Sequence, residues 1–183
     1  MLFQPDIDDS WIVSPLPIPG SSMNIQGAHT INSPALLKIN DRLKIGVLGG
    51  DLLTEMLTNS HRFNMEEDQS KIHAVLKAYL GQRHLYPMYP TYAPMDLTYF
   101  DKLSLTLDNQ MDILIYSSST KLLAEVIDGV LCVNTRHTMT PDSAGHYACI
   151  SIDAKVFSTI SLNNNEMIHP DLSKCAKVEI LKL

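Results

Sequence analysis

Several sequence patterns are scarce or missing in this chain of 183 residues, and each absence excludes a class of function. Positive charge is scarce, because 14 Lys and Arg stand against 20 Asp and Glu and give a formal net charge of −6. Affinity for nucleic-acid backbones comes mainly from Lys and Arg side chains. Any contact of this protein with DNA is therefore predicted to be indirect or weak.

Cysteine pairs and long apolar runs are also missing. Cys132, Cys149 and Cys175 lie far apart without a CxxC pair, which excludes a zinc ribbon or a disulfide framework. No stretch approaches about 18 apolar residues, and the N-terminus has neither the basic region nor the apolar region of a signal peptide. The sequence thus predicts an intracellular protein that makes no contact with membranes.

Motifs that hold cofactors or metals are absent as well. The Gly49-Gly50 pair belongs to neither a GxGxxG nor a P-loop motif and is interpreted as a turn. The seven histidines form no HxH or HxxxH pair, so each is interpreted as a surface or core residue rather than a ligand. We therefore predict no cofactor and no bound metal.

Residues 1–34 are rich in residues that interrupt regular structure. Five prolines and two glycines fall here, so most of this backbone cannot enter a helix interior or a sheet. The residues around Trp11 are nevertheless too apolar for a free tail. We expect an extended segment that packs on the domain, and we take Trp11 as a candidate partner contact.

Residues 35–183 follow the pattern of one mixed α/β domain. Two apolar runs on either side of Asn40-Asp41 predict a β-hairpin, and the glycine pair then leads into a short helix with Asp51 as N-cap. A capping box at Asn64 and Glu67 predicts the start of a second helix. Most of the remaining chain is predicted to be β-structure, with strands at 112–116, 121–127, 130–133, 146–152 and 178–181 and a hairpin turn at Asp128-Gly129.

Tyrosine and proline alternate in residues 82–94, which we call the Tyr-Pro loop. Proline lowers the cost of ordering a loop and tyrosine offers an apolar body with a polar tip, so such a loop suits a protein interface. A loop packed on its own domain is equally compatible with the pattern. The candidate partner contacts in this loop are Tyr86, Pro87, Tyr89, Pro90 and Tyr92.

Three stretches, in this order, resemble one known family. The first is Ser33 to Asn40 with Ile45-Gly46 and Asp51-Leu52-Leu53, and the second is Gln82-Arg83-His84-Leu85-Tyr86-Pro87-Met88-Tyr89-Pro90. The third is Met111 to Ser118, followed by Gly129, Cys132, Val133 and Asn134. Together they resemble the B subunits of DNA polymerase alpha, which are related to the calcineurin-like phosphoesterases. The resemblance covers roughly residues 33 to 153, and its most specific part is the pattern Q-R-x-x-Y-P-x-Y-P.

This resemblance implies the C-terminal half of a phosphoesterase-like domain, with β-sandwich-like sheets flanked by helices. Active enzymes of that fold carry Gly-His-x-His where this chain has Tyr116-Ser117-Ser118-Ser119. Serine hydroxyls do not replace imidazole as transition-metal ligands. We therefore expect Ser117, Ser118, Ser119 and His137 to mark a degenerate ancestral pocket without catalysis. Thr135-Arg136 also departs from the family's usual Pro-Gly.

The function implied by the resemblance is that of a scaffold. Such a protein holds the zinc-bearing C-terminal module of the polymerase alpha catalytic subunit, and through it primase, during initiation of DNA replication in the nucleus. Two alternatives remain open from the residues themselves. One is a residual metallophosphoesterase, and the other is a free-standing protein-interaction module.

Overall fold

The computed structural model describes residues 2–3, 29–31, 33–40, 42–60, 70–90, 97–106, 110–136, 139–140, 143–154 and 171–183. Within these ranges, none of the helices has both the length and the apolar character needed to cross a membrane. Of the first 34 residues, the structure describes chiefly a two-residue parallel pairing between β1 (Leu2–Phe3) and β2 (His29–Thr30). The packing of residues 1–34 on the domain therefore stays a prediction.

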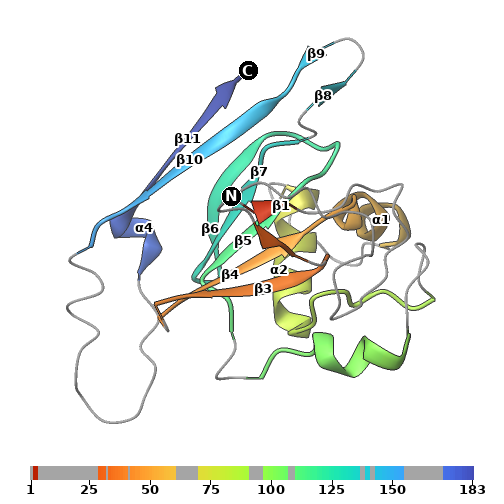
Figure 1. Cartoon of the computed structure of the whole chain (residues 1–183). Coiled ribbons are helices and arrows are strands. Elements are labelled where there is room, and N and C mark those ends of the chain that lie inside the picture. The colour runs from red at the N-terminus through yellow and green to blue at the C-terminus, as the bar shows by residue number, and fades with distance from the viewer. Residues whose placement is uncertain are drawn as a thin grey trace.

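A five-stranded mixed sheet forms the centre of the fold (Figure 1). Strands β4, β5 and β7 run parallel to one another, whereas β3 and β6 pair antiparallel at the two edges. The β6–β7 turn uses Asp128 and Gly129 with φ of 47° and 83°, the conformation that a two-residue hairpin requires. In sheet order the strands are β3 (Ala35–Ile39), β4 (Leu43–Leu48), β5 (Ile113–Tyr116), β7 (Val130–Asn134) and β6 (Leu123–Ile127).

Two helices, α1 (Leu52–Asn59) and α2 (Lys71–Gln82), cover one face of this sheet (Figure 1). Helix α1 follows a turn at Gly50, whose φ of 77° favours glycine, and Asp51 caps it as the sequence predicted. Helix α2 begins at Lys71 after Ser70, so the start predicted at Asn64 is wrong. Asn64 and Glu67 themselves lie outside the described residues.

The helices and the sheet enclose the larger of two hydrophobic cores, which we call the helix-side core. Alternate strand residues point into it, because side chains along a strand alternate between the two faces. Leu48, Leu114 and Cys132 contribute from three adjacent strands, and Leu76 and Tyr79 contribute from α2. All five are at most 5 % exposed, and full burial of each apolar side chain stabilises the fold by about 1.5–3 kcal/mol.

A two-stranded ribbon covers the opposite face of the sheet (Figure 1). It pairs β10 (His146–Ile152) with β11 (Ala176–Lys182), and the short helix α4 (Leu172–Cys175) leads into β11. Its inward residues pack on Leu43, Ile113, Leu131 and Val133 to form what we call the ribbon-side core. Stacking of the ribbon on a helix-covered sheet confirms the expected mixed α/β fold, consistent with part of a phosphoesterase-like domain.

Three smaller elements complete the described structure. A 3₁₀ helix, η1 (Leu97–Leu103), precedes the central strand β5, and two-residue strands β8 (Met139–Thr140) and β9 (Ser143–Ala144) form a small hairpin before β10. None of these elements, nor α4, is predicted from the sequence. The strands predicted beyond residue 110 are confirmed, and their bounds agree at half of the ends and shift by one to two residues at the other half.

Candidate functional site

The candidate site lies where the three parallel strands β4, β5 and β7 have their carboxyl ends, which we call the carboxyl edge of the sheet. Strand β4 is followed by Gly49 to Asp51, β5 by Ser117 to Ser119, and β7 by Thr135 and Arg136. Parallel strands deliver their carboxyl ends to the same edge, and open α/β sheets commonly bind ligands there. The predicted degenerate pocket of Ser117, Ser118 and Ser119 falls at this edge.

Asp51 connects the first two of these segments. One carboxylate oxygen, Oδ2, accepts hydrogen bonds from the backbone nitrogen of Ser119 at 2.9 Å and from its hydroxyl at 2.6 Å. The other, Oδ1, accepts from the backbone nitrogen of Thr54 at 3.1 Å, which caps helix α1. The Thr54 hydroxyl lies 3.1 Å from that of Ser119 and 3.4 Å from that of Ser118. Asp51 therefore fastens the serine loop to α1.

These contacts set the charge of the site. Burial alone raises the pKa of Asp51, but the hydrogen bonds from Ser118, Ser119 and Thr54 outweigh it and hold the pKa below its ordinary value. Glu55, one turn further along α1, behaves in the opposite way: burial raises its pKa and the nearby Asp51 charge adds to the increase, although a hydrogen bond from Tyr86 opposes both. Asp51 is thus the carboxylate that stays ionised.

Asn134 holds the third segment and is completely buried. Its Oδ1 accepts hydrogen bonds from the backbone nitrogens of Ser118 at 3.0 Å and Arg136 at 2.9 Å. Its Nδ2 lies within hydrogen-bond distance of the carbonyl oxygens of Ser118 and Lys121 and of the Thr120 hydroxyl, at 2.9 to 3.3 Å. One amide therefore fixes the path of the whole loop after β5.

Arg136 stands where the resembled family usually has glycine. Its φ of 62° lies in the left-handed region, which glycine adopts without strain and other residues adopt at a cost of about 1 kcal/mol. The family's usual glycine at this place suits that backbone. In this chain the turn is kept by hydrogen bonds, since the backbone nitrogen of Arg136 donates to Asn134 and its carbonyl accepts from the Ser117 hydroxyl at 3.2 Å.

The donor set at this edge does not fit a transition-metal centre. The described part provides one carboxylate, one amide and several serine and threonine hydroxyls, whereas catalytic metal pairs in proteins use imidazole and several carboxylates. Among the described residues, no three His, Cys, Asp or Glu side chains gather closely enough to hold a metal ion. His137, the fourth member of the predicted pocket, lies outside the described residues.

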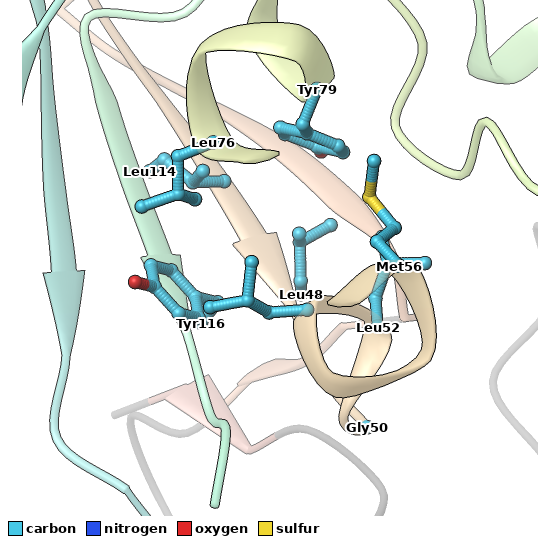
Figure 2. A pocket seen from close by; sticks show the side chains of 9 residues that line it. Leu48, Gly50, Leu52, Met56, Leu76, Tyr79, Leu114 and Tyr116 are labelled. Atoms are coloured by element: carbon cyan, nitrogen blue, oxygen red, sulfur yellow. The ribbon is translucent and has the colours of Figure 1, made fainter. Parts of the chain in front are cut away.

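A small apolar pocket lies under α1, next to this edge (Figure 2). Leu48, Leu52, Met56, Leu76 and Tyr116 are among the residues that line it. Its volume of about 10 Å³ is close to the minimum that one water molecule needs, so it does not admit a substrate. The hydroxyl of Tyr116 is buried without a hydrogen-bond partner in the described structure and points away from Met56 in Figure 2.

The Tyr-Pro loop divides into a buried part and an exposed part. Tyr86 is completely buried, and its hydroxyl donates to Oε2 of Glu55 at 3.0 Å, so its side chain belongs to the helix-side core and is not open to a partner. Tyr89 is 79 % exposed, Pro90 is exposed and Pro87 is half-buried. Trp11 and Tyr92 lie outside the described residues.

Sequence reasoning missed the roles of Asp51 and Asn134 at this edge. Asp51 was predicted only as a helix cap, and Asn134 entered only as part of a matching motif. A usable signal was present, because Asn134 directly follows the fully apolar run Val130 to Val133. A polar residue at the end of a buried strand has to find hydrogen-bond partners inside the protein.

Comparison with known proteins gives two matches. The family model for the B subunits of DNA polymerases alpha and epsilon matches residues 1–123. A protein from Dictyostelium discoideum, named as the B subunit of DNA polymerase alpha, is 24 % identical over 162 residues, which cover 87 % of this chain and 25 % of that protein. The chain therefore spans about a quarter of the length of this relative.

Proposed function

Because this chain belongs to the family of DNA polymerase alpha and epsilon B subunits, we propose that it acts as a non-catalytic scaffold for the polymerase alpha catalytic subunit. Members of the family are accessory subunits of replicative DNA polymerases. The name of the Dictyostelium relative favours polymerase alpha within the family. The proposed place of action is the nucleus, during initiation of replication.

The observation that carries the scaffold proposal is the closed hydrogen-bond network at the carboxyl edge of the sheet. The side chains of Asp51 and Asn134 form hydrogen bonds with backbone groups of Ser118 and Ser119 and with the Ser119 hydroxyl. These bonds fix the loop in place. A nucleophile or metal ligand has to present a lone pair to its substrate or ion instead. The edge of the sheet that carries catalytic residues in related folds is thus proposed to have a structural role in this chain.

The proposed partner is the zinc-bearing C-terminal module of the catalytic subunit, through which the chain would also join primase. Exposed Tyr89 and Pro90 are the described candidates for this contact, since tyrosine is a frequent anchor in protein interfaces. Trp11, Pro87 and Tyr92 remain candidates from the sequence.

The test is co-purification of this chain with the C-terminal module of the polymerase alpha catalytic subunit, with and without the remaining part of a full-length B subunit. A stoichiometric complex is expected. Tyr89→Ala should weaken it more than Tyr147→Ala, a matched control because Tyr147 is an exposed tyrosine on β10. Absence of a complex in both formats would overturn the scaffold proposal and favour a free-standing interaction module.

A further inference from the structure

A second hollow lies at the opposite edge of the sheet, where β5 and β7 begin. It has a volume of about 220 Å³ and is open to solvent between the end of α2 and the β6–β7 turn. Gly81 and Arg83 form one wall, Asp128 lies on the other, and Leu105, Met111 and Val130 give an apolar lining. Small-molecule sites typically measure about 300–1,000 Å³, so this hollow better suits one or two side chains of a protein partner.

Gly81 is a glycine that the chain itself does not require. It is the penultimate residue of helix α2, and glycine has a lower helix propensity than alanine. Its φ is not positive, and a Cβ added to it would meet no described atom within 4 Å. Neither backbone strain nor packing against the described residues therefore explains the missing side chain. Glycine in such a place commonly allows another molecule to approach the backbone.

Arg83, two residues later, is equally unexplained by the chain alone. It ends α2 with φ of 50°, a conformation in which glycine or asparagine is usual. Its backbone is anchored, because its nitrogen donates to the Leu80 carbonyl at 3.2 Å and its carbonyl accepts from the Leu105 nitrogen at 2.7 Å. Its guanidinium makes no ion pair or hydrogen bond with the described residues.

The charges around the hollow favour a ligand with an acidic side chain. Asp128 on the far wall has a cation of its own, since Lys77 Nζ lies 3.7 Å from its Oδ1. Among the described residues that line the hollow, Arg83 is thus the charged side chain without an ion pair. A guanidinium held at a fixed backbone position can bind a carboxylate through two parallel hydrogen bonds.

We propose that this hollow docks a segment of a protein partner that carries an acidic side chain beside an aliphatic one. The carboxylate pairs with Arg83, the aliphatic side chain rests on Met111 and Leu105, and the segment's backbone passes over Gly81. This proposal takes the class of its occupant, a protein, from the proposed scaffold function and adds a docking surface separate from Tyr89.

The test uses the full chain, labelled with ¹⁵N, and an acetylated peptide of sequence Gly-Ser-Glu-Leu-Leu-Ser-Gly. Saturable shifts are expected at the amides of Gly81, Arg83 and Thr106. A peptide with Gln in place of Glu should bind about tenfold more weakly, because a charge-assisted bond is lost. Arg83→Gln should remove this difference between the two peptides.

Gly81→Leu supplies the steric test, because it fills the hollow without a clash at Cβ and improves helix propensity. It should abolish the shifts while the thermal midpoint stays at or above that of the wild type. Ala78→Leu, on an exposed α2 position outside the hollow, should bind like the wild type. Unchanged binding by Gly81→Leu, equal binding of both peptides, or no saturable shift at the hollow would overturn the docking proposal.

Capture of the catalytic-subunit module separates this result from the scaffold proposal. If the chain captures the module but the peptide causes no saturable shift at the hollow, the docking surface is refuted and the scaffold function stands. If the peptide binds the hollow as described but the module is never captured, the scaffold function is refuted and the docking surface stands.

Discussion

At the scale of single residues, Asn134 is predicted to contribute strongly to stability. Its buried amide serves the backbone of Ser118, Lys121 and Arg136, and each buried group left without a partner costs about 1–3 kcal/mol. Asn134→Ala should therefore lower the free energy of unfolding by about 2–4 kcal/mol, measured by urea denaturation. Thr135→Ala is the neighbouring control, with an expected loss below about 0.5 kcal/mol. Equal stability of the two variants would contradict this assignment.

Asp51 makes the stability of the protein dependent on pH. Its pKa is lowered from 3.8 in the folded state and returns to that value on unfolding, so the ionised group stabilises the fold above the unfolded pKa. This stabilisation is lost as the pH falls through the folded pKa. The stability difference between wild type and Asp51→Asn should hold at neutral pH and shrink below about pH 4.

The measurement for Asp51 is a series of urea denaturations from neutral pH to about pH 2. Ser119→Ala removes a hydroxyl donor to Asp51. Like Asp51→Asn, it should therefore make the free energy of unfolding less dependent on pH in the acid range. A wild-type advantage over Asp51→Asn that persists unchanged into acid would show that the hydrogen bonds do not favour the ionised form.

Single residues also show where prediction of the site stopped. The serine triplet was located from the sequence because it follows a strongly apolar strand within a matched motif. The burial of Tyr86 was not predictable, since its pattern of Tyr and Pro is the same as that of exposed Tyr89. Tertiary contacts distinguish the two, since Tyr86 joins the helix-side core and its hydroxyl donates to Glu55 on α1.

At the scale of elements, α4 and the ribbon close the second face of the sheet. Leu172 in α4 is 1 % exposed and packs with Leu43, Ile113, Leu131 and Val133. Leu172→Ala should cost about 2–4 kcal/mol of unfolding free energy, because it leaves a cavity in the ribbon-side core. Urea denaturation measures the change.

The matched control for Leu172 is Lys174→Ala in the same short helix. Lys174 is exposed and pairs with Asp171 on the surface at 2.7 Å, a solvated contact that contributes little to stability. A Leu172→Ala variant no less stable than this control would mean that α4 contributes little to closing the core.

Prediction of elements succeeded where a local pattern repeats over several residues. The 35–48 hairpin, helix α1 and strands β5 to β7 follow from apolar alternation and from turn residues such as Asp128-Gly129. The start of α2 was predicted wrongly from a capping-box pattern that the helix does not use. The four-residue helix α4 is too short to show a period.

At the scale of the whole molecule, the net charge of −6 predicts weak affinity for DNA. Binding of the isolated chain to duplex DNA at about 150 mM salt should be weaker than about 10 µM, because few phosphates can be neutralised. Fluorescence anisotropy with a labelled duplex measures this affinity. A submicromolar Kd that falls steeply with salt would contradict the prediction and indicate a direct DNA-binding surface.

The sequence by itself determined the mixed α/β class, the central strands, the Asp51 cap and the family, because each depends on local periodicity or on short matched motifs. Tertiary structure alone decided that Asp51 and Asn134 join three strand ends, that Tyr86 is buried while Tyr89 is exposed, and that Gly81 and Arg83 share one hollow. These relations connect residues up to 68 positions apart. They arise when parallel strands bring distant carboxyl ends to one edge, a juxtaposition that no local pattern encodes.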